Sequence, residues 1–254
     1  MARSAGASLV DVAANLARIR SRIEQAATRC GRSSEEVLVV GVSKGAEVGR
    51  IAQAARAGLT DLGENYLQEA APKIESLRRE RSGATESALP QQINWHLVGH
   101  LQTNKVKRAL ELFDLIQTVD SLRLGEEISR RAQAHSRRVP VLVEVNTSGE
   151  ASKFGVTPEG TVSIVEQLAA LPGVLVEGLM TIGPLDAEEQ RLRTTFRQLK
   201  ALFDSVNERV LPGHLRWLSM GMTADFEMAI EEGSNLVRIG TGIFGPRHPA
   251  KEVT

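Results

Sequence analysis

The chain has 254 residues, of which 42% are hydrophobic and 24% are charged, so it can bury a large core as one domain or two small ones. Its 31 Lys and Arg residues balance its 31 Asp and Glu residues, and this balance does not favour nucleic acid or an anionic membrane surface as a partner. The single cysteine, Cys30, excludes an internal disulfide and a cysteine-rich metal site. Without a signal peptide or a long apolar run, we expect a soluble cytoplasmic protein.

Apolar residues at helical spacing predict a first helix over residues 9–29, with Ser8 as its cap and Gly31 at its end. Strand and helix patterns then alternate along the chain. Strands are expected at residues 37–43, 60–63, 93–99, 115–119, 139–146, 174–180, 215–219 and 236–239. Helices are expected at residues 48–57, 67–79, 104–112, 122–134, 158–170, 188–210 and 223–232.

This rhythm predicts an α/β fold, a single (β/α)8 barrel of the TIM type with an extra N-terminal helix. A doubly wound open sheet is the alternative, but it rarely needs eight strands in a chain this short. Without a break in composition, we expect one domain over residues 1–254, with an ordered core at about residues 8–245. Residues 83–92 are predicted to form a long surface loop and residues 246–254 a loose tail.

Lys44 ends the apolar run that forms the first predicted strand. In a parallel sheet, this end of a strand is where α/β proteins place their chemistry. A lysine that is partly desolvated there loses its proton more readily, and the free amine can attack a carbonyl to form a Schiff base. The alternative is an ordinary surface lysine that ends a strand.

The two last strands end in segments rich in glycine and hydroxyl groups, which are typical of phosphate-binding loops in barrels. After the seventh strand come Ser219, Gly221, which lets backbone approach a ligand, and Thr223, which can cap the next helix. After the eighth come Gly240 and Thr241. An amine beside a phosphate cup suits either pyridoxal 5′-phosphate (PLP) or a phosphorylated sugar in a Schiff-base aldolase, and the residues alone leave both open.

Residues 95–105 read Trp-His-Leu-Val-Gly-His-Leu-Gln-Thr-Asn-Lys, and this stretch resembles the signature of the pyridoxal phosphate homeostasis protein family, also called the YggS or PROSC family. Further segments agree with that family in order and spacing: residues 42–44, 63–69, 145–146, 153–155, 178–181, 218–223 and 237–240. The chain departs from the pattern after Lys44, where Gly45, Ala46 and Glu47 replace the usual Thr and Pro.

The resemblance implies a barrel like the N-terminal domain of alanine racemase (PLP fold type III) with no second β-domain. It implies that Lys44 carries PLP as a Schiff base. Ser219, Gly240 and Thr241 would then hold the phosphate.

By the same resemblance, Arg238 faces the pyridine nitrogen, and Asn65 and Met220 border the ring. A guanidinium only donates hydrogen bonds, so it favours the unprotonated ring, which is a weak electron sink. Together with this weak sink, the resemblance implies a PLP-binding protein of cofactor homeostasis, with apo PLP-dependent enzymes as its partners, rather than a robust catalyst. We expect no metal, and a monomer because no partner domain is needed to close the site.

Two enzymes are the alternatives, a PLP-dependent amino-acid racemase and an aldolase that uses no PLP. The resembling two-base racemases use a tyrosine from a second domain, which this chain lacks. Tyr66, its only tyrosine, is predicted to be a packing residue. No second lysine or carboxylate relay at the strand ends supports the aldolase. His96 and His100 are predicted to be hydrogen-bonded structural histidines rather than general bases.

Overall fold

The apolar runs of the sequence form the strands of a closed parallel barrel. The computed structural model describes residues 10–83, 89–150 and 152–246, and in this part of the chain each of eight strands pairs with the next, while β8 closes the ring by pairing with β1. The strands are β1 (Leu38–Val42), β2 (Asp61–Glu64), β3 (Asn94–Leu97), β4 (Leu115–Val119), β5 (Val139–Glu144), β6 (Val174–Met180), β7 (Trp217–Met222) and β8 (Leu236–Ile239). This confirms the predicted (β/α)8 barrel.

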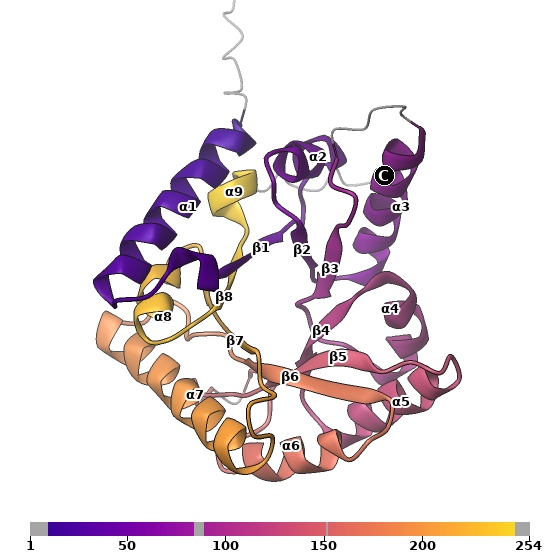
Figure 1. Ribbon diagram of the computed structural model, residues 1–254, viewed down its shortest axis with the longest axis vertical. Coiled ribbons are helices and arrows are strands. Elements are labelled where there is room, and N and C mark those ends of the chain that lie inside the picture. The colour runs from indigo at the N-terminus through magenta and orange to yellow at the C-terminus, as the bar shows by residue number, and fades with distance from the viewer. Residues whose placement is uncertain (1–9, 84–88, 151, 247–254) are drawn as a thin grey trace, which may run out of the picture.

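Helices surround the barrel and cover its outer face (Figure 1). They are α1 (Val12–Arg29), α2 (Val48–Arg56), α3 (Leu67–Gly83), α4 (Val106–Leu112), α5 (Leu122–Gln133), α6 (Thr161–Ala169), α7 (Glu189–Arg209), α8 (Phe226–Glu231) and α9 (Thr241–Phe244). Short 3-10 turns, η1 (Ser34–Glu36) and η2 (Thr103–Lys105), precede β1 and α4. The η1 turn and the four-residue α9 were not among the predicted elements, because segments this short carry no helical periodicity, whereas η2 overlaps the start of the helix predicted at residues 104–112.

Helix α1 packs against α8 and α9, so that the first helix of the barrel lies beside the last two on one side of the ring (Figure 1). Its carboxylate cap is Asp11, whose Oδ1 accepts a hydrogen bond from the N–H of Ala14 at 2.9 Å. The helix therefore begins at Val12, and the predicted start at residue 9 is wrong; Ser8 lies outside the described residues. Gly31 follows the helix with a φ of 70°, as predicted.

The strand side chains alternate between two layers, as the period of a strand requires. Ile116 faces outward into the main core beneath the helices, whereas its neighbour Leu115 belongs to a small inner cluster with Leu142 and Met180. Other inward positions carry polar side chains, which are buried and lie in the interior of the barrel: His96, Gln117, Ser219 and Arg238.

Strand β7 ends later than predicted, because Ser219 and Met222 both pair with β8, with a register shift between them. Gly221, with a φ of 96°, lies in this strand, and a Cβ there would come within 2.6 Å of the Cβ of Ala229 in α8. The glycine thus permits close packing of α8, and the approach of a ligand to its backbone stays a prediction. Thr223 is not the helix cap that we predicted, because α8 begins after Asp225.

Candidate functional site at the carboxyl ends of the strands

Lys44 lies at the mouth of the barrel, the face formed by the carboxyl ends of the strands and the loops that follow them. Its half-buried side chain brings Nζ to 3.5 Å from the hydroxyl of Tyr66 and 4.8 Å from the centre of that ring. A cation over an aromatic face is attracted by the electrons of the ring. Tyr66 is 53% exposed, so its prediction as a packing residue is wrong, and it instead contacts the candidate nucleophile.

The loop that carries Lys44 is a tight turn. The N–H of Ala46 donates a hydrogen bond to the carbonyl of Ser43 at 2.9 Å, and Gly45 has a φ of 72°. A positive φ at the third position of a turn favours glycine over any residue with a side chain. The residues that depart from the family pattern after Lys44 therefore build a well-defined turn that holds the lysine at the mouth.

A buried ion-pair network forms hydrogen bonds to the main chain of this turn on both sides of Lys44. The Nζ of Lys73 donates to the carbonyl oxygen of Ser43 at 2.7 Å and to the Oε1 atoms of Glu64 and Glu69 at 2.7 and 2.8 Å. Glu69 in turn accepts a hydrogen bond from the N–H of Gly45. The peptide units before and after Lys44 are thus fixed by charged side chains, which make stronger hydrogen bonds than neutral ones.

Glu64 lies at the carboxyl end of β2 and is completely buried. Burial raises the pKa of Glu64, because it outweighs the hydrogen bonds from Lys73 and Ser43 that favour the carboxylate. For Glu69, which is less buried, the hydrogen bonds from Lys73 and Gly45 outweigh burial and lower the pKa. Lys73 therefore has at least one ionised partner at neutral pH.

Lys44 and the glycine-rich segment after β8 line one small cavity, although nearly 200 residues separate them along the chain. Gly240 and Thr241 form its other side, where α9 begins. The N–H of Gly242 donates to Oγ1 of Thr223 at 3.3 Å, which ties the loop after β7 to this segment. Closure of the barrel between β1 and β8 brings the amine and the predicted phosphate cup together.

Arg238 points into the barrel beneath this cavity and is 5% exposed. Its guanidinium donates to Oγ of Ser219 at 2.5 Å and to the carbonyl of Thr181 at 2.8 Å. Burial lowers the pKa of Arg238 to about 10, while Asp225 and Glu144 favour its charged form, so it stays a cation at neutral pH. The inward direction of Arg238 agrees with the sequence prediction.

Ser219 lies deeper in the barrel than predicted, because β7 continues for three residues beyond it. Its buried hydroxyl donates to Gln117 at 2.7 Å in addition to accepting from Arg238. Its role toward a phosphate stays a prediction. Met220, the next residue, packs into the main core beneath the helices, and its contact with a ligand ring also stays a prediction.

His96 continues this polar chain across the barrel. Its Nδ1 lies 2.9 Å from the amide nitrogen of Gln117, and its Nε2 lies 3.1 Å from Oδ1 of Asp61. Both ring nitrogens therefore have partners, which confirms the prediction of a hydrogen-bonded histidine. This row of hydrogen-bonded side chains links Arg238 to Asp61 at the far end of the barrel interior. It satisfies polar groups that burial would otherwise leave unpaired.

A hollow of about 520 Å³, here called the mouth pocket, opens beside Lys44 among the loops after β2 to β6. Asn65 lines it, as does Tyr66, which brings the pocket next to the amine. His100 also lines it, stacked on Phe154 at 3.7 Å and paired with Asp120 at 3.3 Å. The pairing of His100 was missed because its carboxylate partner is twenty residues away in the sequence. The two residues meet only because they follow the neighbouring strands β3 and β4.

Sequence reasoning also missed Glu144, which ends β5 and lines the mouth pocket. A single acidic residue in the apolar run of residues 139–145 was the available signal, because a charge within a buried strand needs a purpose or a partner. Lys73 gave no such signal, since lysines on helices are usually solvated.

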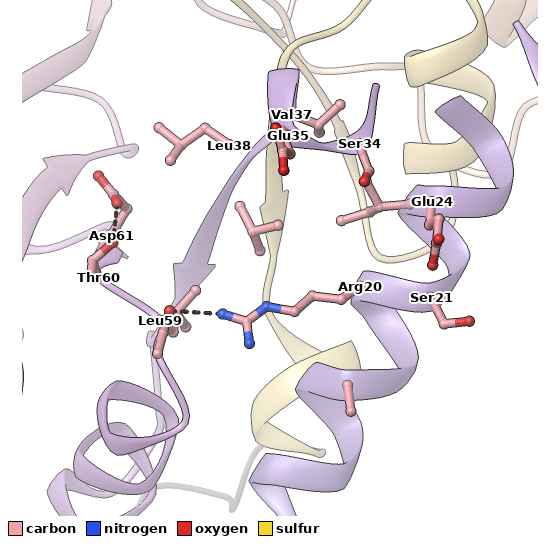
Figure 2. A pocket seen from close by; sticks show the side chains of 14 residues that line it. Arg20, Ser21, Glu24, Ser34, Glu35, Val37, Leu38, Leu59, Thr60 and Asp61 are labelled. Atoms are coloured by element: carbon pink, nitrogen blue, oxygen red, sulfur yellow. Dashed lines mark hydrogen bonds between the residues drawn. The ribbon is translucent and has the colours of Figure 1, made fainter. Parts of the chain in front are cut away.

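Another hollow lies at the opposite end of the barrel, between α1 and the starts of β1 and β2 (Figure 2). Arg20 reaches across it from α1, but its guanidinium is committed to the carbonyls of Ala57 and Gly58 at 3.0 and 2.7 Å, where α2 ends. Since these bonds complete a helix terminus, Arg20 has a structural role. The hollow lies away from Lys44 and takes no part in the candidate site.

Comparison with known proteins identifies relatives over almost the whole chain. Residues 14–248 match the family model described as alanine racemase, N-terminal domain. A pyridoxal phosphate homeostasis protein of Escherichia coli is 38% identical over 242 residues, covering 95% of this chain and 99% of the relative. One from Aquifex aeolicus is 40% identical over 232 residues, covering 91% and 96%.

Among solved structures, PipY of Synechococcus elongatus with PLP bound superposes with a TM-score of 0.77 at 30% identity, covering 92% of this chain and all of PipY. Within the described residues of this chain, no helix is both long enough and apolar enough to cross a membrane.

Proposed function

Because the chain belongs to the pyridoxal phosphate homeostasis protein family, we propose that it binds PLP as a Schiff base on Lys44 and serves to buffer the cofactor and deliver it to apo-enzymes in the cytoplasm. PLP is bound to PipY, which has the same fold and 30% sequence identity to this chain. When bound, PLP supplies an aldehyde carbon and an electron-withdrawing ring.

The observation that carries this proposal is the shared cavity of Lys44, Gly240 and Thr241. An amine and a glycine-rich segment that line one cavity match the two ends of PLP, its aldehyde and its phosphate. Thr241 adds a hydroxyl donor on the same side. The turn that holds Lys44 is fixed by Lys73 and Glu69, so the amine is oriented before the ligand arrives.

Arg238 and Ser219 complete the proposed site from below. We assign Arg238 to the pyridine nitrogen, and Ser219 to the phosphate and to the positioning of that guanidinium through the 2.5 Å contact. A permanent cation at the ring nitrogen keeps this nitrogen unprotonated, which weakens the ring as an electron sink. This arrangement favours storage of the cofactor over turnover. Asn65, which lines the mouth pocket, borders the ring in this proposal.

The test is a spectroscopic titration of the purified protein with PLP. We expect the absorbance band of a protonated imine in the wild type and its loss in Lys44→Ala. Lys105→Ala is the matched control, because Lys105 also lies at the mouth and lines the mouth pocket. An imine band that persists in Lys44→Ala, or that disappears in Lys105→Ala, would reject Lys44 as the site.

A further inference from the structure

The mouth pocket contains a carboxyl group that the site has not yet used. Glu144 is 5% exposed and lines the pocket, yet in the described part of the chain its side-chain carboxyl group has no hydrogen bond and no ion pair. A buried carboxyl group without a partner is costly to the fold. Glu144 lines a pocket large enough for a small ligand, which points to a partner that is supplied from outside.

The surroundings of Glu144 allow it to be charged when a cation arrives. Burial and the nearby carboxylate of Asp120 raise the pKa of Glu144 to about 7, although Arg238 favours the ionised form. Asp120 is already paired with His100, and Arg238 is held by Ser219 and the carbonyl of Thr181. Asp120 repels an ionised Glu144, and Arg238 attracts it only from a distance, because the hydrogen bonds of its guanidinium go to Ser219 and Thr181.

The walls of the pocket are apolar and aromatic. Phe154 and Tyr66 are 54% and 53% exposed, although large hydrophobic side chains are usually buried, and Val98 and Ile182 add aliphatic surface. The ring of Tyr66 already faces one ammonium, that of Lys44, at 4.8 Å. A carboxyl group at depth with apolar walls complements an ammonium group on an apolar stem.

We propose that the mouth pocket binds a primary ammonium group carried on an apolar stem, and that Glu144 is its counter-ion. The source is either a small free amine or the side chain of a lysine in a peptide. The biological meaning of this pocket rests on the proposed function. An ammonium bound there places a second primary amine beside Lys44, where an acceptor of the cofactor would have to enter.

The experiment is isothermal titration calorimetry on the cofactor-free protein at pH 8, with n-butylammonium chloride as the probe and n-butanol as its uncharged analogue. We expect the ammonium to bind and the alcohol to bind at least about tenfold more weakly, because a charge-assisted hydrogen bond is lost. Glu144→Gln should weaken ammonium binding by about tenfold or more, while Glu47→Gln, which removes an exposed carboxylate from the same end of the barrel, should leave it unchanged.

Equal binding of the two probes, or ammonium binding that is unchanged in Glu144→Gln, would overturn the proposal. A lysine blocked at both its main-chain ends distinguishes the two sources, because it binds if the pocket accepts lysine side chains and fails to bind if the pocket accepts only free amines. The titrations require no PLP. A wild type that binds the ammonium but shows no imine band would therefore reject the proposed function and keep the pocket, and the reverse result would reject the pocket alone.

Discussion

The ammonium of Lys73 lies 2.7 Å from the carbonyl oxygen of Ser43, the residue that precedes Lys44. One buried lysine thus positions another that is exposed to the ligand. The contact joins helix α3 to the loop after β1, and the same ammonium neutralises Glu64, whose second carboxylate oxygen has no partner among the described residues. The fold and the site depend on the same charge.

Removal of this charge should be costly. In Lys73→Met, Glu64 keeps its burial but loses its counter-ion, and we expect the free energy of unfolding to fall by about 3–5 kcal/mol. The matched control is Lys200→Met, which breaks the more exposed pair with Asp204 and should cost less than about 1 kcal/mol. Urea denaturation measures both. Similar losses in the two variants would show that the buried network contributes no more than a surface pair.

The raised pKa of Glu144 predicts a pH dependence of stability. The folded protein holds the proton up to about pH 7, whereas the unfolded chain releases it near its ordinary value of 4.5. Between these values the folded state binds more protons, so stability relative to Glu144→Gln should fall as pH rises, by up to about 1.4 kcal/mol per pH unit. Urea midpoints of the two proteins from pH 4 to 8 test this, and parallel curves would contradict it.

Gly221 provides a test of the packing behind β7. Alanine there meets Ala229 at 2.6 Å and must adopt a φ of 96°, so Gly221→Ala should destabilise the protein by about 1–3 kcal/mol. Gly49 is the matched control, because it lies in helix α2 and a Cβ there meets no atom within 4 Å. Gly49→Ala should stabilise the protein by about 0.5–1 kcal/mol, since alanine is the better helix former. Thermal unfolding that ranks the variants in the opposite order would refute this assignment.

A search for racemase activity tests the enzyme alternative. Removal and return of a Cα proton on opposite faces of a substrate requires acid–base groups on both faces. Lys44 and Tyr66 instead contact each other at 3.5 Å, so there is no room for a substrate between the two groups. We expect alanine incubated with the PLP-loaded protein in deuterated water to show no exchange at Cα above the rate with free PLP, as followed by NMR. Rapid exchange with turnover would establish catalysis.

The sequence was sufficient to predict the barrel and the closeness of Lys44 to the segment at Gly240, which lines the same cavity. Both follow from the order of the strands and the closure of the barrel. It misplaced the end of β7, since Gly221 in residues 219–222 indicated a turn, whereas β7 shifts its register there and pairs with β8 again at Met222. This error is what made Ser219 appear to be at the rim of the barrel rather than within it.

The network around Lys44 could not be predicted for a different reason. Lys73 follows the periodicity of a surface helix, and only the packing of α3 against the barrel buries it. Glu144 was accessible in principle, because it ends an apolar strand. Whether its carboxyl group finds a hydrogen-bond partner, however, depends on how the loops after β2 to β6 fold, and no local sequence pattern specifies that.

The central claim is that the amine of Lys44 is the covalent attachment point of PLP. Reduction of the PLP-loaded protein with borohydride, followed by proteolysis and peptide mass spectrometry, tests it most directly. The account predicts one stoichiometric phosphopyridoxyl adduct on the peptide that contains Lys44. An adduct on Lys73, Lys105 or Lys153 with Lys44 unmodified, or an unmodified protein, would contradict it.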